Sequence, residues 1–202
     1  GKTHGPYTHV VVTAPAPQTA ALLRDSGLTD ARLSRLDAAS MAPCWALMVS
    51  FHEALDLPVD AIEIDGAPVS WLAREASKAG RAPGHRWVVH ASPDAARAQL
   101  EEPADHVAAN LLAALRDMVG PLPATDSLDV HRWRYARVTE AAGEPALYAA
   151  DLGVGACGDW CRGARVEEAF LSGLAMADLL VDDASQRLGA VLVVRTALLI
   201  WI

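Results

Sequence analysis

Cysteine is scarce in this 202-residue chain, and its three cysteines, Cys44, Cys157 and Cys161, are an odd number. Three scattered thiols cannot form a disulfide framework. Free thiols are typical of a reducing compartment, so we expect a cytoplasmic protein. The Cys157-x3-Cys161 spacing resembles half of a metal site, but no second Cys/His pair lies nearby to complete a zinc ligand set. We therefore interpret the cysteines as buried free thiols and expect no metal.

Basic residues are also few. Lys and Arg number 17 against 25 Asp and Glu, which leaves a formal net charge of −8. Because nucleic-acid phosphates are bound by clustered Lys and Arg, and the chain has no long basic run, we expect no nucleic-acid partner. The apolar share is 52%, with only 12 Pro and 14 Gly, so the chain can form a hydrophobic core and lacks the composition of a disordered protein.

The two ends of the sequence are unusual. Neither an initiator Met nor a signal peptide precedes the first predicted strand, so we interpret the chain as the middle of a longer protein. The last segment, residues 188–202, is mostly apolar but contains Arg195 in its middle. Since a membrane-spanning helix needs about 20 apolar residues, we expect no membrane anchor. A buried terminal strand and a foreign or frame-shifted tail are the alternatives.

Hydrophobic periodicity predicts a mixture of strands and helices. Short β-branched or apolar runs predict strands at residues 10–14, 44–51, 61–64, 69–73, 87–91 and 128–135. Asp65-Gly66 predicts a hairpin turn. Helical spacing and proline placement predict helices at residues 15–23, 93 onward, 103–119 and 165–181. Residues 41–136 are strand-rich with helices inserted late, which indicates a mixed or antiparallel sheet covered on one side.

Residues 153–158 match the dinucleotide-binding pattern Gly-x-Gly-x-x-Gly. That pattern works only when a helix follows its last glycine, and here no helical period starts until about Arg165. We therefore assign these glycines to a strand that enters a loop. The loop leads to a helix N-terminus, whose free N–H groups and dipole favour an anionic or electron-rich ligand. Asp159 is placed to accept a hydrogen bond from a ligand hydroxyl; an ordinary loop with a capping Asp is the alternative.

The helix after this loop is predicted to bury one apolar face that is rich in small residues. The members of that face are Val166, Ala169, Phe170, Gly173, Leu174, Ala177 and Leu180. Gly173 would let this helix lie close to a strand or a cofactor.

The same segment resembles the C-terminal flavin-binding motif of the FAD-dependent amine oxidase superfamily. The motif here reads Gly158-Asp159, a short loop, and then Gly163-Ala164-Arg165-Val166-Glu167-Glu168-Ala169-Phe170-Leu171-Ser172-Gly173. Glu168 stands where the motif usually has glycine. Segments such as 10–18, 43–48 and 87–92 agree in the same order, so the resemblance extends over residues 7–180 and is greatest to the renalase-like bacterial branch.

The resemblance implies a fold of the α+β and α/β classes. Residues 31–146 would form a mixed-sheet substrate domain with helices. Residues 1–30 and 147–182 would be pieces of a Rossmann-type FAD-binding domain, and residues 183–202 an apolar tail. The family's own N-terminal Gly-x-Gly-x-x-Gly is absent from this sequence. We therefore expect a fragment that is inactive by itself and holds FAD poorly.

The resemblance also implies site residues. The cofactor FAD would be bound by Gly158, Asp159, Arg165, Val166, Glu167 and Ala169. Asp159 would hold the ribityl or pyrophosphate region, and N–H groups around Val166 and Glu167 would face the pyrimidine ring of the flavin. The catalytic candidates are Trp133, Tyr135 and His90, and the substrate candidate is Arg74. Alternatively, His90 is a core histidine, and Trp133 and Tyr135, which share one face of a strand, simply pack.

The activity implied is that of an FAD-dependent oxidase. A small-molecule substrate, either a reduced NAD(P)-like nicotinamide or an amine, would pass a hydride equivalent to the flavin. Molecular oxygen would then accept the electrons and form hydrogen peroxide. The protein would supply positioning and electrostatics, because the cofactor carries the redox chemistry. A non-enzymatic binding module that keeps the scaffold without the cofactor is the alternative.

Overall fold

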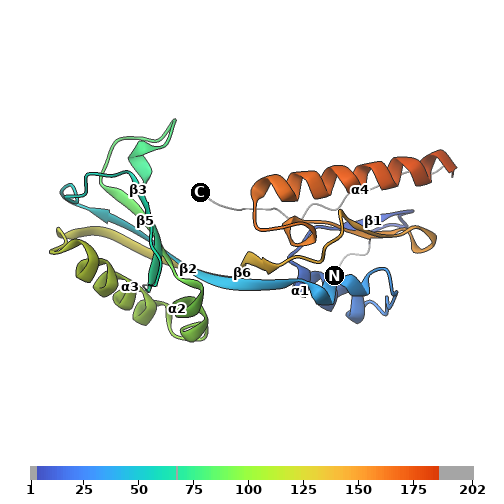
Figure 1. The fold of residues 1–202 in the computed structure, drawn as a ribbon, viewed down its shortest axis with the longest axis horizontal. Helices are drawn as coiled ribbons and strands as arrows, with labels where there is room; N and C mark the ends of the chain where they lie inside the picture. The colour runs from blue at the N-terminus through green and yellow to red at the C-terminus, as the bar shows by residue number, and fades with distance from the viewer. Residues whose placement is uncertain (1–3, 67, 187–202) are drawn as a thin grey trace. The chain divides into compact units, whose positions relative to one another are not determined.

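The computed structural model describes residues 4–66 and 68–186. The chain forms two compact units: the first combines Gly1–Met41 with Arg137–Ile202, and the second is Ala42–Ala136 (Figure 1). The chain passes from one unit to the other along β2 (Ser40–Phe51) and returns along β6 (Thr125–Glu140). The sequence predicted both strands, but the predicted strands, at residues 44–51 and 128–135, are shorter than the observed ones. Of the predicted apolar tail, residues 183–186 continue the helix α4 (Val166–Gln186), and residues 187–202 lie outside the described residues.

A five-stranded sheet with the order β3-β4-β5-β2-β6 forms the second unit. Its remaining strands are β3 (Ala61–Glu63), β4 (Val69–Arg74) and β5 (Arg86–Ala91). Strand β4 pairs antiparallel with β3 and with β5, and β5 pairs antiparallel with β2. The hairpin predicted at Asp65-Gly66 is confirmed, since β3 and β4 flank this turn.

One face of this sheet packs against two helices, α2 (Pro93–Ala98) and α3 (Ala104–Val119) (Figure 1). Ser92 begins α2 by accepting the Ala95 N–H at its hydroxyl, and Gly120 ends α3. Helix α3 buries residues at helical spacing, while alternate strand residues point at it. The core between them includes Trp45, Leu47, Leu72, Trp87, Val89, Val107, Leu111 and Leu115. The short 3-10 turn η2 (Glu75–Ser77) follows β4.

The first unit contains a three-stranded mixed sheet with the order β1-β8-β7. Its strands are β1 (Val10–Val12), β7 (Leu147–Ala149) and β8 (Val154–Ala156). Strand β8 runs parallel to β1 and antiparallel to β7. The short turns of this unit are η1 (Ser34–Ala38), η3 (Ala150–Leu152) and η4 (Asp159–Cys161). The two sheets and their helices confirm the predicted mixed α+β class.

Helices α1 (Ala16–Asp25) and α4 (Val166–Gln186) lie on opposite faces of this sheet (Figure 1). The alternation of β1 explains the arrangement: Val12 packs in the cluster that contains α1 residues, and Val11 packs with Met176 and Leu180 of α4. Within the described part of the chain, no helix is long and apolar enough to cross a membrane.

Helix α4 is rotated relative to the sequence prediction. Its buried side chains are Ser172, Met176, Leu180 and Asp183. Of the predicted face, only Leu180 is among them; Phe170 is 67% exposed and Val166 60% exposed. The close approach to a strand occurs not at Gly173 but at Gly155 of β8, where an added Cβ would lie 2.7 Å from the Met176 sulfur; the alternative of a cofactor beside Gly173 stays a prediction. No described atom lies within 4 Å of the corresponding point at Gly173.

Candidate flavin-binding loop and substrate face

The loop between β8 and α4 is fixed by two buried side chains. Trp160 donates its indole N–H to the Ala14 carbonyl at 3.1 Å. Ser172 donates its hydroxyl to the Pro145 carbonyl at 2.7 Å and accepts the Gly158 N–H at 3.2 Å. Glycine is needed at position 158, because a Cβ there would lie 2.5 Å from the Trp160 indole nitrogen. These contacts anchor the loop at the start of α4.

The first turn of α4 presents two N–H groups that have no acceptor among the described residues, those of Val166 and Glu167. The N–H groups that follow, of Glu168 and Ala169, both bond to the Arg165 carbonyl. Val166 and Glu167 are exposed, so their donors are accessible. Two free donors at the positive end of a 21-residue helix suit an electron-rich group.

Asp159 lies in η4, within the same loop. Its carboxylate accepts the Trp160 N–H at 2.8 Å, which orients the side chain. Partial burial raises the pKa of this carboxyl above its usual value. The donors of the α4 first turn and this carboxylate acceptor therefore belong to one anchored segment. This donor and acceptor set fits a cofactor that carries both hydroxyl groups and a ring with carbonyl oxygens.

The predicted catalytic residues gather on the other face of the five-stranded sheet. Strand register aligns Glu63 with Trp71, Trp71 with His90, and His90 with Ala46. This row lies opposite α2 and α3, because the neighbouring residues Leu72, Val89 and Leu47 belong to the helix-covered core. We call this surface, which α2 and α3 do not cover, the open face, although Ala46, Val88 and His90 on it are buried. Its members include Ala46, Met48, Trp71, Val88, His90, Trp133 and Tyr135.

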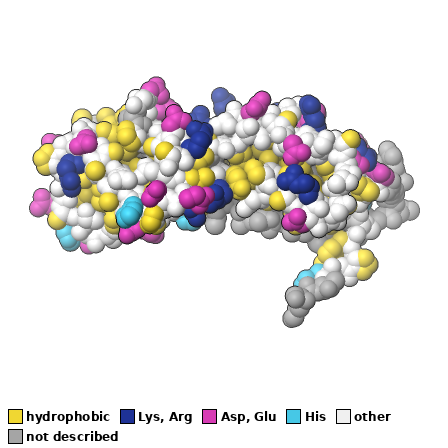
Figure 2. Space-filling model, turned by 90° about the horizontal axis from the view of Figure 1, so that it is seen from below, with side chains coloured by type: hydrophobic (Ala, Val, Ile, Leu, Met, Phe, Trp, Pro, Cys, Tyr) yellow, Lys and Arg dark blue, Asp and Glu magenta, His cyan; other side chains and the backbone are white. Residues whose placement is uncertain are grey.

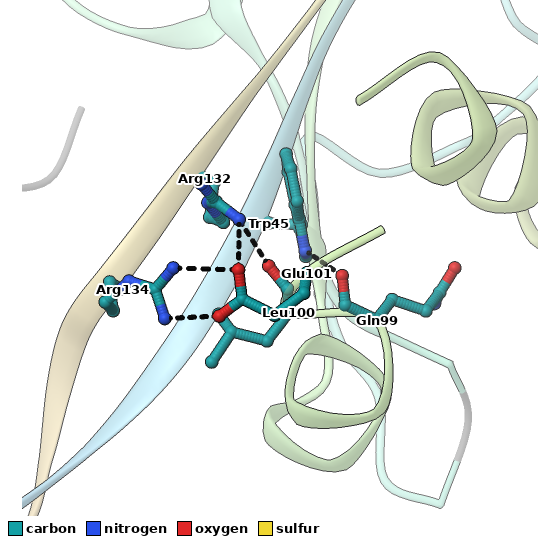
Figure 3. A network of polar contacts seen from close by, with 6 residues as sticks. All are labelled: Trp45, Gln99, Leu100, Glu101, Arg132 and Arg134. Atoms are coloured by element: carbon teal, nitrogen blue, oxygen red, sulfur yellow. Dashed lines mark hydrogen bonds and ion pairs between the residues drawn. The ribbon is translucent and has the colours of Figure 1, made fainter. Parts of the chain in front are cut away.

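A polar network around Arg132 and Arg134 shows which way the side chains of β6 point (Figure 3). Glu101 accepts hydrogen bonds from Arg132 at 3.1 Å and from Arg134 at 2.6 and 3.1 Å. Arg132 also donates to the Leu100 carbonyl at 2.6 Å, and its guanidinium carbon lies 5.6 Å from the ring centre of the core residue Trp45. Since Arg132 and Arg134 point to the helix-covered side, the alternate residues Trp133 and Tyr135 point away from it.

Sequence reasoning missed this network. The only sequence signal was the alternation of arginine with aromatic residues along His131-Arg132-Trp133-Arg134-Tyr135. Beside Arg134 and Arg132, the pKa of the Glu101 carboxyl is lowered. On the face shown in Figure 2, Lys and Arg side chains are interspersed with Asp and Glu.

Arg74 is not brought together with the other candidates. Arg74 lies on the same face of β4 as Leu72, which is the face that α2 and α3 cover. The carbon of its guanidinium lies 5.0 Å from the centre of the Trp87 ring. It donates to the Leu57 carbonyl at 2.9 Å and lies 3.7 Å from the Asp60 carboxylate. These contacts give Arg74 a structural role at the edge of the second unit, and its substrate role stays a prediction.

The cysteines are free. Cys157 and Cys161 are buried, as predicted, and Cys44 is half-buried. Burial raises the pKa of the Cys44 and Cys157 thiols to about 11. Among the residues with described positions, no group of three His, Cys, Asp or Glu is arranged to hold a metal ion.

The burial of His90 is expected to make the chain less stable at acidic pH. Burial, and secondarily the charge of Lys78, lowers its pKa below the usual 6.5. On acidification below pH 6.5 the unfolded chain therefore binds a proton at this site before the folded chain does, and the free energy of unfolding falls. We expect a His90→Gln variant to lose this part of the slope. Urea unfolding of both proteins from pH 7.5 to 5 measures it; identical slopes would contradict the assignment.

The fold is of mixed α+β class, and the β8–α4 loop places donors and a carboxylate acceptor at the start of a helix. The sequence profile of the flavin containing amine oxidoreductases matches residues 1–181, and the chain belongs to this family. FAD is therefore the cofactor of its family, as the sequence predicted.

A solved structure supports the fold. The chain is similar to a protein from Exiguobacterium sp. 255-15 assigned as a protoporphyrinogen oxidase, with a TM-score of 0.65 and 16% sequence identity. The alignment covers 88% of this chain and 41% of that protein, so this chain spans less than half of the length of its structural neighbour.

Proposed function

We propose that this chain is part of a flavin-dependent oxidoreductase and that its β8–α4 loop binds FAD. The observation that carries the proposal is the loop itself: Asp159 and the free N–H groups of Val166 and Glu167 lie in one anchored segment. Membership of the flavin containing amine oxidoreductase family supports it. When bound, the flavin would supply the redox chemistry, by accepting a hydride equivalent and passing electrons to O2 to give hydrogen peroxide.

Each residue of the loop has a proposed role. Asp159 accepts hydrogen bonds from the ribityl hydroxyls or the neighbouring region of FAD. The N–H groups of Val166 and Glu167 donate to the pyrimidine ring, where the positive end of α4 stabilises negative charge. Arg165 and Ala169 complete the first turn through the Arg165 carbonyl. Gly158 permits the close contact with Trp160 that fixes the loop.

On the substrate side, we propose that the open face of the second unit contacts a small molecule. Trp133 is 42% exposed there; its ring centre lies 4.3 Å from that of His131, and its exposed part is available to pack against a ligand ring. His90 is buried, and its lowered pKa keeps it neutral near pH 7. A reduced nicotinamide-like molecule, as in the renalase-like branch, or an amine is the proposed substrate. The free cysteines support a cytoplasmic location.

Titration of the purified chain with FAD tests the proposal. Binding should quench flavin fluorescence, and the same measurement on a longer version that includes the upstream coding region should give tighter binding. Peroxide formation is then measured with reduced nicotinamide isomers and with amines. If neither version binds FAD or forms peroxide, the oxidoreductase proposal fails and the non-enzymatic binding module is favoured.

A further inference from the structure

Glu168 and Arg162 form an ion pair beside the proposed flavin loop. Glu168 lies in the first turn of α4, and its carboxylate accepts a hydrogen bond from the Arg162 Nε at 2.8 Å. The side chains are only partly exposed, at 34% for Arg162 and 24% for Glu168. The Glu168 stem lies beside Gly163, with its Cγ 3.7 Å from the point that a Gly163 Cβ would occupy. The carboxylate is thus turned toward the loop side of the helix start.

A glutamate in the first turn of a helix is attracted to the positive N-terminal end of that helix. The capping-box donor for a glutamate at this position, the Arg165 N–H, already donates to the Gly163 carbonyl at 3.0 Å, but the helix dipole attracts the carboxylate charge to the first turn. The N–H groups of Val166 and Glu167 have no acceptor among the described residues. The dipole therefore draws an unrestrained Glu168 carboxylate toward the donors that a bound flavin would need.

We propose that Arg162 is a positioning residue that holds the Glu168 carboxylate away from the free N–H groups of α4 and neutralises its charge. The inference rests on the proposed function, since it concerns the same flavin site. Arg162 prevents Glu168 from acting as an internal competitor of the flavin.

The loop fixes Arg162 in the place that this role requires. The Arg162 N–H donates to the Asp159 carbonyl at 2.9 Å, and the Gly163 N–H donates to the same oxygen at 2.8 Å. The backbone of Arg162 is therefore tied to the residue that carries the proposed ribityl-binding carboxylate. Because this backbone is fixed, the pairing of Arg162 with Glu168 requires only the two side chains to become ordered.

The test is a set of FAD titrations on the longer version that includes the upstream coding region. The proteins are the wild type, Arg162→Gln, Glu168→Ala and the double variant. Arg162→Gln releases Glu168 and should weaken FAD binding about fivefold, within the range of a charge at a helix N-terminus. Glu168→Ala should bind at least as tightly as the wild type, and the double variant should bind like Glu168→Ala. Arg97→Gln, which breaks the exposed Arg97–Asp94 pair of α2, matches the change in charge and should leave binding unchanged.

The restored affinity of the double variant is the decisive result, because a merely structural loss at Arg162 would persist in it. Circular dichroism and thermal unfolding establish that each variant is folded. Equal affinity of Arg162→Gln and the wild type, or a double variant as weak as Arg162→Gln, would overturn the inference and leave the proposed function standing. Failure of the wild type to bind FAD in either length of chain would overturn the proposed function and this inference with it.

Discussion

Replacing Gly153 by alanine is expected to lower the free energy of unfolding of the first unit by about 3 to 4 kcal/mol. Gly153 has φ +62°, in the left-handed region, and a Cβ at this position would collide with the Thr8 carbonyl oxygen. Its own carbonyl accepts the Val10 N–H at 2.8 Å, so moving Thr8 away disturbs the start of the β1–β8 pairing. Urea unfolding followed by circular dichroism measures the loss.

A matched glycine separates the two causes. Gly143 belongs to the same unit and also has a positive φ, of +80°, but no described atom lies within 4 Å of its Cβ position. Gly143→Ala should therefore cost only the backbone strain, about 1 kcal/mol. If both alanine variants are equally stable, the collision with Thr8 is not the cause.

The second large effect is expected on cofactor binding. Asp159→Ala should weaken FAD binding by at least about tenfold, since a hydrogen bond from a ligand hydroxyl to a carboxylate is among the stronger kinds. Asp159→Asn should weaken binding too, although its amide oxygen can still accept the Trp160 N–H. Fluorescence titration with FAD measures both. Asp178→Asn, an exposed change on α4, is the control and should bind as the wild type does.

Asp159→Asn, which should weaken FAD binding, should not lower the stability of the chain. Burial raises the Asp159 pKa above 3.8, so the folded chain binds this proton more readily than the unfolded chain, and stability falls as pH rises through that window. At neutral pH the ionised Asp159 carboxyl therefore lowers the free energy of unfolding. Asp159→Asn removes it and should match or exceed the wild type in Tm at pH 7. Lower Tm together with unchanged FAD binding would assign Asp159 a structural role instead.

Local sequence signals predicted most of the elements. Asp65-Gly66 specified the β3–β4 hairpin, because few dipeptides adopt the required turn, and Ser92-Pro93 specified the start of α2. The apolar spacing of Val107, Leu111 and Leu115 specified the buried side of α3. These features depend on residues close in sequence, so no knowledge of the tertiary structure was needed to find them.

The orientation of α4 could not be predicted in this way. The helix is apolar around much of its circumference, so its composition fits several rotations. Packing decided among them: Gly155 leaves room for Met176, and Ser172 bonds to the loop backbone at Gly158 and Pro145. Both contacts join residues distant in sequence, and the apolar period contains no information about them.

By itself, the sequence determined the mixed α+β class, the flavin family motif and the strand–loop–helix that contains Asp159. Only the tertiary structure decided that His90 shares a face with Trp133 and Tyr135, that Arg74 does not, and that Arg162 restrains Glu168. The physical reason is that strand and helix periods are local, whereas the pairing of strands and the partner of a charged side chain depend on how distant segments pack.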